Sequence, residues 1–123
     1  MTIQYGAQTV GAITGTVNFN TANIATGVKF GTVPNGARVI EAFTIVRTIF
    51  NAGTTDYFRL GFNAGGIEYT GNDIDVAVAG RQTNDFAFDY NPFLADRDVW
   101  ARYVGGGAAP TAGQLQFVIM WVL

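Results

Sequence analysis

Residues 32–46 constrain the fold most, because a tight turn leads directly into the longest apolar run in the first half of the chain. Pro34 fixes its own φ, and Asn35 and Gly36 are residue types that readily adopt positive φ. The run behind them is rich in β-branched and aromatic residues, which is typical of a strand buried on much of both faces. We therefore predict a structural turn at Pro34, Asn35 and Gly36 that directs one strand into the core.

Helical spacing is an alternative for residues 38–50. Glu41, Thr44 and Arg47 interrupt the apolar run at every third position, as they would on a helix. The β-branched content and the Gly and Asn residues on either side favour a strand.

Alternation of apolar and polar residues predicts further short strands. We expect them at residues 16–19, 27–33, 56–62, 67–70, 72–79, 86–90, 98–104 and 114–123, with loops that include residues 51–55 and 80–84. About eight or nine short strands, roughly ten residues apart and without a helix, are typical of one all-β domain. The fold class predicted is a single-domain antiparallel β-sandwich or barrel.

The first 26 residues differ in character from the rest. They are rich in Thr, Gly, Ala and Asn with scattered apolar residues, and only residues 16–19 suggest a short strand. We predict an extended N-terminal arm over residues 1–26 that reaches across a subunit boundary, and a β-sandwich domain over residues 27–123. The whole chain has the size of one domain.

The last predicted strand is apolar on both faces. Leu115, Phe117 and Ile119 alternate with Val118 and Met120, so the apolar–polar alternation of a half-exposed strand is missing. Such a strand is either central and covered twice or pressed against another chain. Left uncovered, it would promote aggregation.

Low charge also indicates association. Charged residues are 13% of the chain, against about 25% in ordinary soluble domains. Lys29 is the single lysine among seven basic residues, and interfaces are depleted in lysine and enriched in arginine and aromatics. We predict a homo-oligomer. The candidate interface residues are Ile3, Tyr5, Val10, Ile13, Arg38, Phe93, Trp100, Arg102, Tyr103, Val118, Met120 and Val122.

Catalytic signatures are missing. The chain has no Cys and no His, which removes thiolate chemistry and the usual general base. The pairs Asp73/Asp75 and Asp96/Asp98 lack the twelve-residue calcium pattern, and the glycines at 105–107 lack a phosphate-loop signature. We expect a protein that is not an enzyme, with no metal, no cofactor and no small-molecule substrate.

The weakly acidic charge of −2 argues against a nucleic-acid partner. The N-terminus does not resemble a signal peptide, and no run approaches the length of a membrane span. We therefore expect no membrane partner.

Two stretches carry a family resemblance. Residues 34–41 read Pro-Asn-Gly-Ala-Arg-Val-Ile-Glu, and residues 94–101 read Leu-Ala-Asp-Arg-Asp-Val-Trp-Ala, followed by Tyr103, a Gly105–Gly107 loop and Thr111-Ala112-Gly113. In this order they resemble a group of small head-associated proteins of tailed bacteriophages. The resemblance implies a jelly roll and a virion structural protein, most often a decoration (cement) subunit. It further implies a homotrimer on the outer head surface, bound to the major capsid protein and made in the host cytoplasm.

Two other functions remain open at this point. The chain could be another virion component, in the tail, collar or stopper. It could also be a carbohydrate- or receptor-binding β-sandwich module, which requires exposed aromatics beside Asp, Asn and Arg in a groove.

Overall fold

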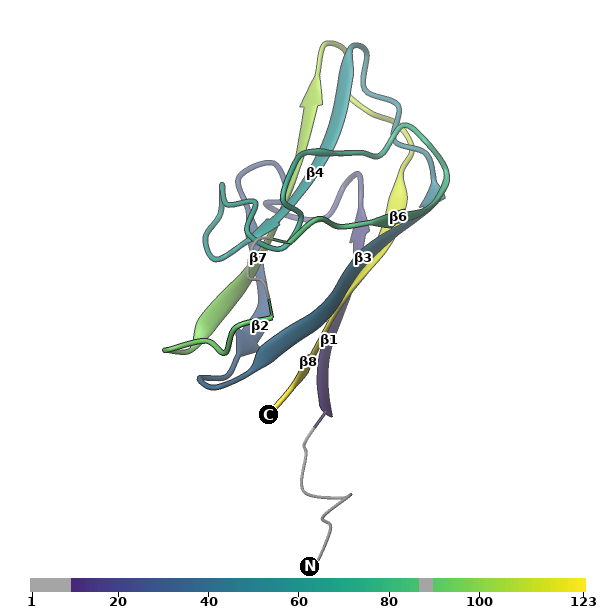
Figure 1. The fold of residues 1–123 in the computed structure, drawn as a ribbon. Helices are drawn as coiled ribbons and strands as arrows, with labels where there is room; N and C mark the ends of the chain where they lie inside the picture. The colour runs from purple at the N-terminus through teal and green to yellow at the C-terminus, as the bar shows by residue number, and fades with distance from the viewer. Residues whose placement is uncertain (1–9, 87–89) are drawn as a thin grey trace, which may run out of the picture.

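A computed structural model describes residues 10–86 and 90–123, and this part of the chain forms two four-stranded sheets without a helix (Figure 1). The strands are β1 (Val10–Asn18), β2 (Val28–Val33), β3 (Arg38–Thr48), β4 (Thr55–Gly61), β5 (Ile74–Asp75), β6 (Gly80–Thr83), β7 (Arg97–Gly106) and β8 (Gln114–Val122).

The strand order is that of a jelly roll. Sheet A has the order β1-β8-β3-β6 and sheet B the order β2-β7-β4-β5, and all pairings are antiparallel. The chain alternates between the sheets for its first three crossings and closes with β8 between β1 and β3. Eight strands in two packed Greek-key sheets define this fold. The prediction of an all-β, jelly-roll-like sandwich is confirmed.

The core lies between the sheets and is centred on β8. Leu115, Phe117, Ile119 and Trp121 point inward and are buried. The Phe117 ring meets Phe30 edge-on at 5.0 Å between centroids. Each such buried side chain stabilises the fold by about 1.5–3 kcal/mol. Of the two apolar faces that the sequence predicts for this strand, the one with Leu115, Phe117 and Ile119 is the buried one.

The turn at Pro34–Gly36 leads from β2 in sheet B into β3 in sheet A. Gly36 has φ +87°, and the Ala37 N–H donates to the Pro34 carbonyl at 3.1 Å. The Asn35 N–H donates to Asp96 Oδ1 at 2.8 Å, and the Gly36 N–H to the carbonyl of Phe93 at 2.8 Å. The two sequence stretches that carry the family resemblance therefore contact each other at this turn.

β1 is longer than predicted. It begins at Val10, well before residue 16, and pairs with β8 along its whole length. Thr, Gly and Ala give a weak local strand signal, and the pairing with β8 decides the structure. Residues 10–18 of the expected arm thus belong to sheet A. Ile3 and Tyr5 lie outside the described residues.

The middle of the chain departs furthest from prediction. The strand predicted at residues 67–70 is wrong: the Gly71 N–H donates to the Ile67 carbonyl at 2.6 Å in a turn. The strand predicted at 72–79 shrinks to Ile74–Asp75. Residues 80–84 are not the predicted loop, since Gly80–Thr83 pairs with β3 as an edge strand of mostly polar residues. Phe86 and Tyr90 lie outside strands, and residues 87–89 are not among those described.

Candidate functional site

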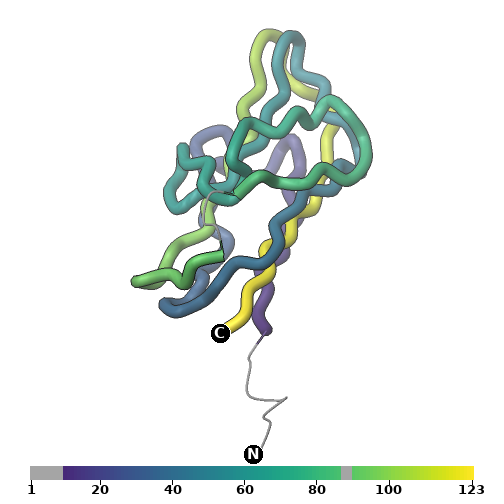
Figure 2. Tube along the Cα trace, viewed as in Figure 1, coloured from purple at the N-terminus to yellow at the C-terminus, as the bar shows by residue number. Residues whose placement is uncertain are grey.

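The outward face of sheet A is apolar along its middle. Residues opposite each other in antiparallel strands share a face, and Ala12 lies opposite Met120 while Phe43 lies opposite Val118. Figure 2 shows β1 and β8 running side by side. We name this surface the apolar strip, which consists of Val10, Ala12, Phe43, Ile45, Val118, Met120 and Val122. Its members are half-buried or exposed, and Val10 is 62% exposed.

Three arginines, from β3 and β6, lie along part of the margin of the apolar strip. Arg38 lies opposite Val122 at one end. The Arg81 guanidinium lies 4.5 Å from the centre of the Phe43 ring and pairs with Glu41. Arg47 donates two hydrogen bonds to Gln116 Oε1, at 3.1 and 2.8 Å. An apolar centre with an arginine rim is the usual composition of a protein–protein interface.

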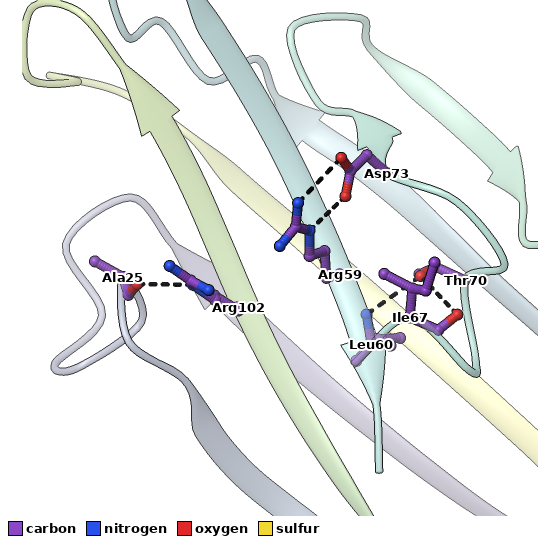
Figure 3. A network of polar contacts seen from close by, with 7 residues as sticks. All are labelled: Ala25, Arg59, Leu60, Ile67, Thr70, Asp73 and Arg102. Carbon is purple, nitrogen blue, oxygen red and sulfur yellow. Dashed lines mark hydrogen bonds and ion pairs between the residues drawn. The ribbon is translucent and has the colours of Figure 1, made fainter. Parts of the chain in front are cut away.

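Charged side chains on the outward face of sheet B find partners within the chain. Arg59 binds Asp73 through two nitrogen–oxygen contacts, and Arg102 Nε donates to the Ala25 carbonyl at 2.9 Å (Figure 3). Lys29 Nζ lies 3.2 Å from Asp98 Oδ1. The hydrogen bond from Lys29 lowers the pKa of Asp98 below its usual value.

The structure divides the predicted interface residues into groups. Val10, Arg38, Val118, Met120 and Val122 gather on the outward face of sheet A. Trp100 and Arg102 lie on the outward face of sheet B.

The remaining described candidates point into the sandwich. Phe93 and Tyr103 are buried, and Ile13 packs against the core. The Tyr103 hydroxyl donates to the buried Asp56 carboxylate, which also accepts the Ala52 N–H at 2.9 Å. Burial and this carboxylate raise the pKa of Tyr103 above the usual tyrosine range. The Asp56 carboxylate is therefore already engaged by hydrogen bonds from its own chain.

The outward position of Phe43 and Ile45 does not follow from the sequence alone. The register of β3 against β8 shifts between Val39 and Glu41, and such a bulge moves the following side chains to the other face. A strand that looks apolar on both sides contains no local signal for this shift.

A cavity of about 400 Å³ opens beside β6. It is lined by Ile40, Glu41, Ala42, Thr83, Asn84, Asp85, Phe86 and Tyr90. Tyr90 is 60% exposed. The buried Asn84 accepts a hydrogen bond from Thr44 Oγ1 at 3.2 Å, while its Nδ2 has no partner among the described residues. An aromatic ring beside carboxylate and amide groups suits a polar ligand such as a sugar.

The predicted acidic pairs are engaged separately. Asp73 binds Arg59, Asp75 accepts the Ala77 N–H at 2.9 Å, and Asp96 accepts the Asn35 N–H. In the described ranges no three His, Cys, Asp or Glu residues gather as metal ligands. Across the same ranges, no helix has the length and apolar character needed to cross a membrane.

This chain is similar to known proteins in its three-dimensional structure. No family profile and no curated protein sequence matches the chain. A chain from the acid-stable capsid structure of Helicobacter pylori bacteriophage KHP30 is similar, with a TM-score of 0.68 and 18% identity over 94% of this chain and 91% of that chain.

Two further structures are similar. For the capsid asymmetric unit of cyanophage Pam1 the TM-score is 0.65 and the identity 15%, over 100% of this chain and 91% of that chain. For the capsid of Ralstonia phage GP4 the values are 0.64 and 21%, over 95% and 84%. At these identities the likeness shows a shared jelly-roll fold.

Proposed function

We propose that this chain is a virion structural protein of a tailed bacteriophage, and that it binds the outer surface of the head as a decoration (cement) subunit. One observation carries the proposal: the three similar chains described above come from phage capsid structures, and the match spans 84–91% of their lengths. The likeness thus covers nearly the whole of a small subunit and not one part of a larger shell protein. The two stretches that meet at the Pro34 turn support the same class.

The apolar strip supplies the docking surface in this proposal. Val118, Met120 and Phe43 would be covered by the major capsid protein, while Arg38 and Arg81 donate hydrogen bonds at the margin. Covering apolar area is favourable by about 25 cal/mol per Å², and a standard interface of about 1,600 Å² is sufficient for stable association. Shell subunits bridged by such a cap separate only after the cap is removed, so the head withstands more internal pressure.

Self-association is part of the proposal. The resemblance implies three copies at a head site of three-fold symmetry, and in this proposal the N-terminal arm, with Ile3 and Tyr5, contacts a neighbouring copy. A trimer multiplies the number of contacts per binding event, which strengthens attachment without new kinds of contact.

The test uses heads assembled without this chain. Purified protein is added back, and cryo-electron microscopy locates the added density. We expect density that fits the jelly roll on the outer head surface, together with a higher temperature for DNA release. Density at the tail, collar or stopper would assign the chain to another virion component. Absence of binding to any part of the particle would overturn the virion role.

A second function is favoured by the cavity beside β6. Tyr90, Asp85 and Asn84 form the aromatic and polar group that a carbohydrate-binding module needs. Under this alternative, a glycan array shows binding that Tyr90→Ala abolishes and that Trp100→Ala, on the other sheet, leaves unchanged. Glycan binding without head binding would replace the decoration proposal.

A further inference from the structure

The four sheet edges are protected to very different degrees. β5 is two residues long, β6 has four residues and carries Arg81, and β2 carries Lys29 and a register shift between Lys29 and Gly31. Short length, charge and bulges are the usual means of preventing pairing with another chain. β1 has none of them: its nine residues contain no charge and no proline. It forms the margin of sheet A beside β8 (Figure 1).

The free edge of β1 presents backbone hydrogen-bonding groups. In an antiparallel ladder, alternate residues direct both their N–H and C=O toward the same neighbour. The Phe19 N–H donates to the Gly113 carbonyl, and this pair continues the register of the β1–β8 ladder. The backbone N–H and C=O groups of the odd-numbered residues of β1 therefore point toward β8. The backbone groups of Ala12, Thr14 and Thr16 therefore point away from the sheet. Within the described part of the chain no hydrogen bond to them is formed.

The unpaired groups are symmetric about Thr14. At one end Asn18 is already satisfied, because its N–H donates to Thr21 Oγ1 at 2.8 Å and its carbonyl accepts the Thr21 N–H at 3.1 Å. At the other end the strand begins at Val10. An antiparallel partner strand centred on Thr14 would thus satisfy Ala12, Thr14 and Thr16 together.

We infer that this edge pairs with β1 of a second copy of the chain, about a two-fold axis at Thr14. Thr14 then faces Thr14 of the second copy, and Ala12 faces Thr16. Cross-strand Thr pairs are favourable, and no like charges meet because the strand has none. The same pairing satisfies the edges of both copies at once, as an isologous contact does. It joins two sheets A into one continuous sheet.

This contact goes beyond the proposed function and does not depend on it. Pairing of identical edges is two-fold, so it links two single chains or two trimers. It requires no head, and it is measured on the purified chain.

The experiment uses the lack of cysteine in the sequence. Hydrogen-bonded antiparallel partners have Cα atoms about 5.5 Å apart, within the range of about 4.4–6.8 Å that a disulfide needs. Thr14→Cys should therefore form a covalent dimer under mild oxidation. In Thr16→Cys the two cysteines lie four residues out of register, roughly 13 Å apart. This control should cross-link at least tenfold more slowly, by random collision only.

A mixture of Ala12→Cys and Thr16→Cys tests the register itself. These two positions face each other in the inferred dimer, so the mixture should cross-link quickly although each variant alone does not. Equal rates for Thr14→Cys and Thr16→Cys would overturn the inference.

Light scattering gives a second, independent measurement. Proline is tolerated where an edge-strand N–H faces solvent, so Thr14→Pro removes the edge donor without removing a bond to β8. We expect the wild-type mass to be halved in Thr14→Pro, with unchanged circular dichroism. Equal masses would contradict the contact. A monomeric wild type would also overturn the inference.

Discussion

The outward faces of the two sheets differ in their side chains: sheet A carries the apolar strip, and sheet B carries charged groups that pair within the chain. The central strand β8 places Val118 and Met120 on the face of sheet A, where arginines lie only at the margin. On sheet B, Arg59 and Lys29 each bind a carboxylate of the same chain. These charged groups of sheet B are thus paired within one chain, whereas on sheet A the described residues leave the apolar strip uncovered. We therefore expect the outward face of sheet A, more than that of sheet B, to gain free energy when a partner covers it.

The largest effect should follow from placing a charge on the apolar strip. Val118→Glu puts a carboxylate where the proposed interface excludes water, and an unpaired buried charge is strongly unfavourable. We expect head binding to weaken about 100-fold, or about 2.7 kcal/mol. The free chain should keep its stability to within about 1 kcal/mol, because the side chain can reach water there. Sedimentation of labelled protein with heads measures the loss.

Val104→Glu is the matched control for this substitution. Val104 is also half-buried and also lies outward on a central strand, but on sheet B. Its binding to heads should stay within about twofold of wild type. Equal losses for the two variants would show that the apolar strip does not dock.

The turn between the sheets should give the next largest effect. Gly36 has φ +87° and little around it, with Leu123 Cδ2 3.9 Å from an added Cβ. Backbone strain is therefore the main cost, and Gly36→Val should lower the free energy of unfolding by about 1–2 kcal/mol. Gly65→Ala, at a glycine without positive φ or close neighbours, should be nearly neutral. Urea denaturation measures both, and a neutral Gly36→Val would contradict the role of this turn.

The parts of the fold that were predictable are those with a strong local signal. Pro34, Asn35 and Gly36 specify a turn by residue type, and the period of two in Gln114–Val122 places Leu115, Phe117 and Ile119 on one face of β8. β1 and β6 were not predictable in the same way. Their Thr, Gly and polar residues form strands because β8 and β3 offer edges to pair with, and a partner in space leaves no local pattern.

The candidate site was predictable in part for a related reason. Val118, Met120 and Val122 belong to a strand apolar on both faces, and that pattern pointed to a covered surface. Aromatic residue types do not separate a core from an interface, so the sequence offers Tyr103 as an interface candidate while the structure buries it within one chain.

Two ion pairs, one on each outward face, provide a second test of the difference between the faces. Arg59 on sheet B and Arg81 on sheet A both bind a carboxylate of their own chain. Exposed pairs of this kind contribute about 0–1 kcal/mol. Arg59→Met should therefore lower stability by about 0.5 kcal/mol and leave head binding unchanged.

Arg81→Met should show the reverse pattern. Its more exposed pair should affect stability less, while loss of the guanidinium at the margin of the apolar strip should weaken head binding about threefold to tenfold. Thermal unfolding and head sedimentation together test this. If Arg59→Met and Arg81→Met changed stability and head binding by the same amounts, the two faces would not differ in their role in docking.

The smallest effect concerns acid stability on sheet B. The Lys29 ammonium and the Thr32 hydroxyl both favour the ionised form of Asp98, so its pKa in the folded chain is below the usual 3.8. A lowered carboxyl pKa stabilises the fold above the unfolded value and loses that contribution as pH falls through the folded value. Asp98→Asn should therefore be slightly less stable than wild type at pH 7, and the gap should close below about pH 3.8. Because the pair is exposed, 1 M salt should also narrow the gap at pH 7. If the difference in stability between wild type and Asp98→Asn stayed constant from pH 7 to pH 2, the Lys29–Asp98 contact would not stabilise the fold.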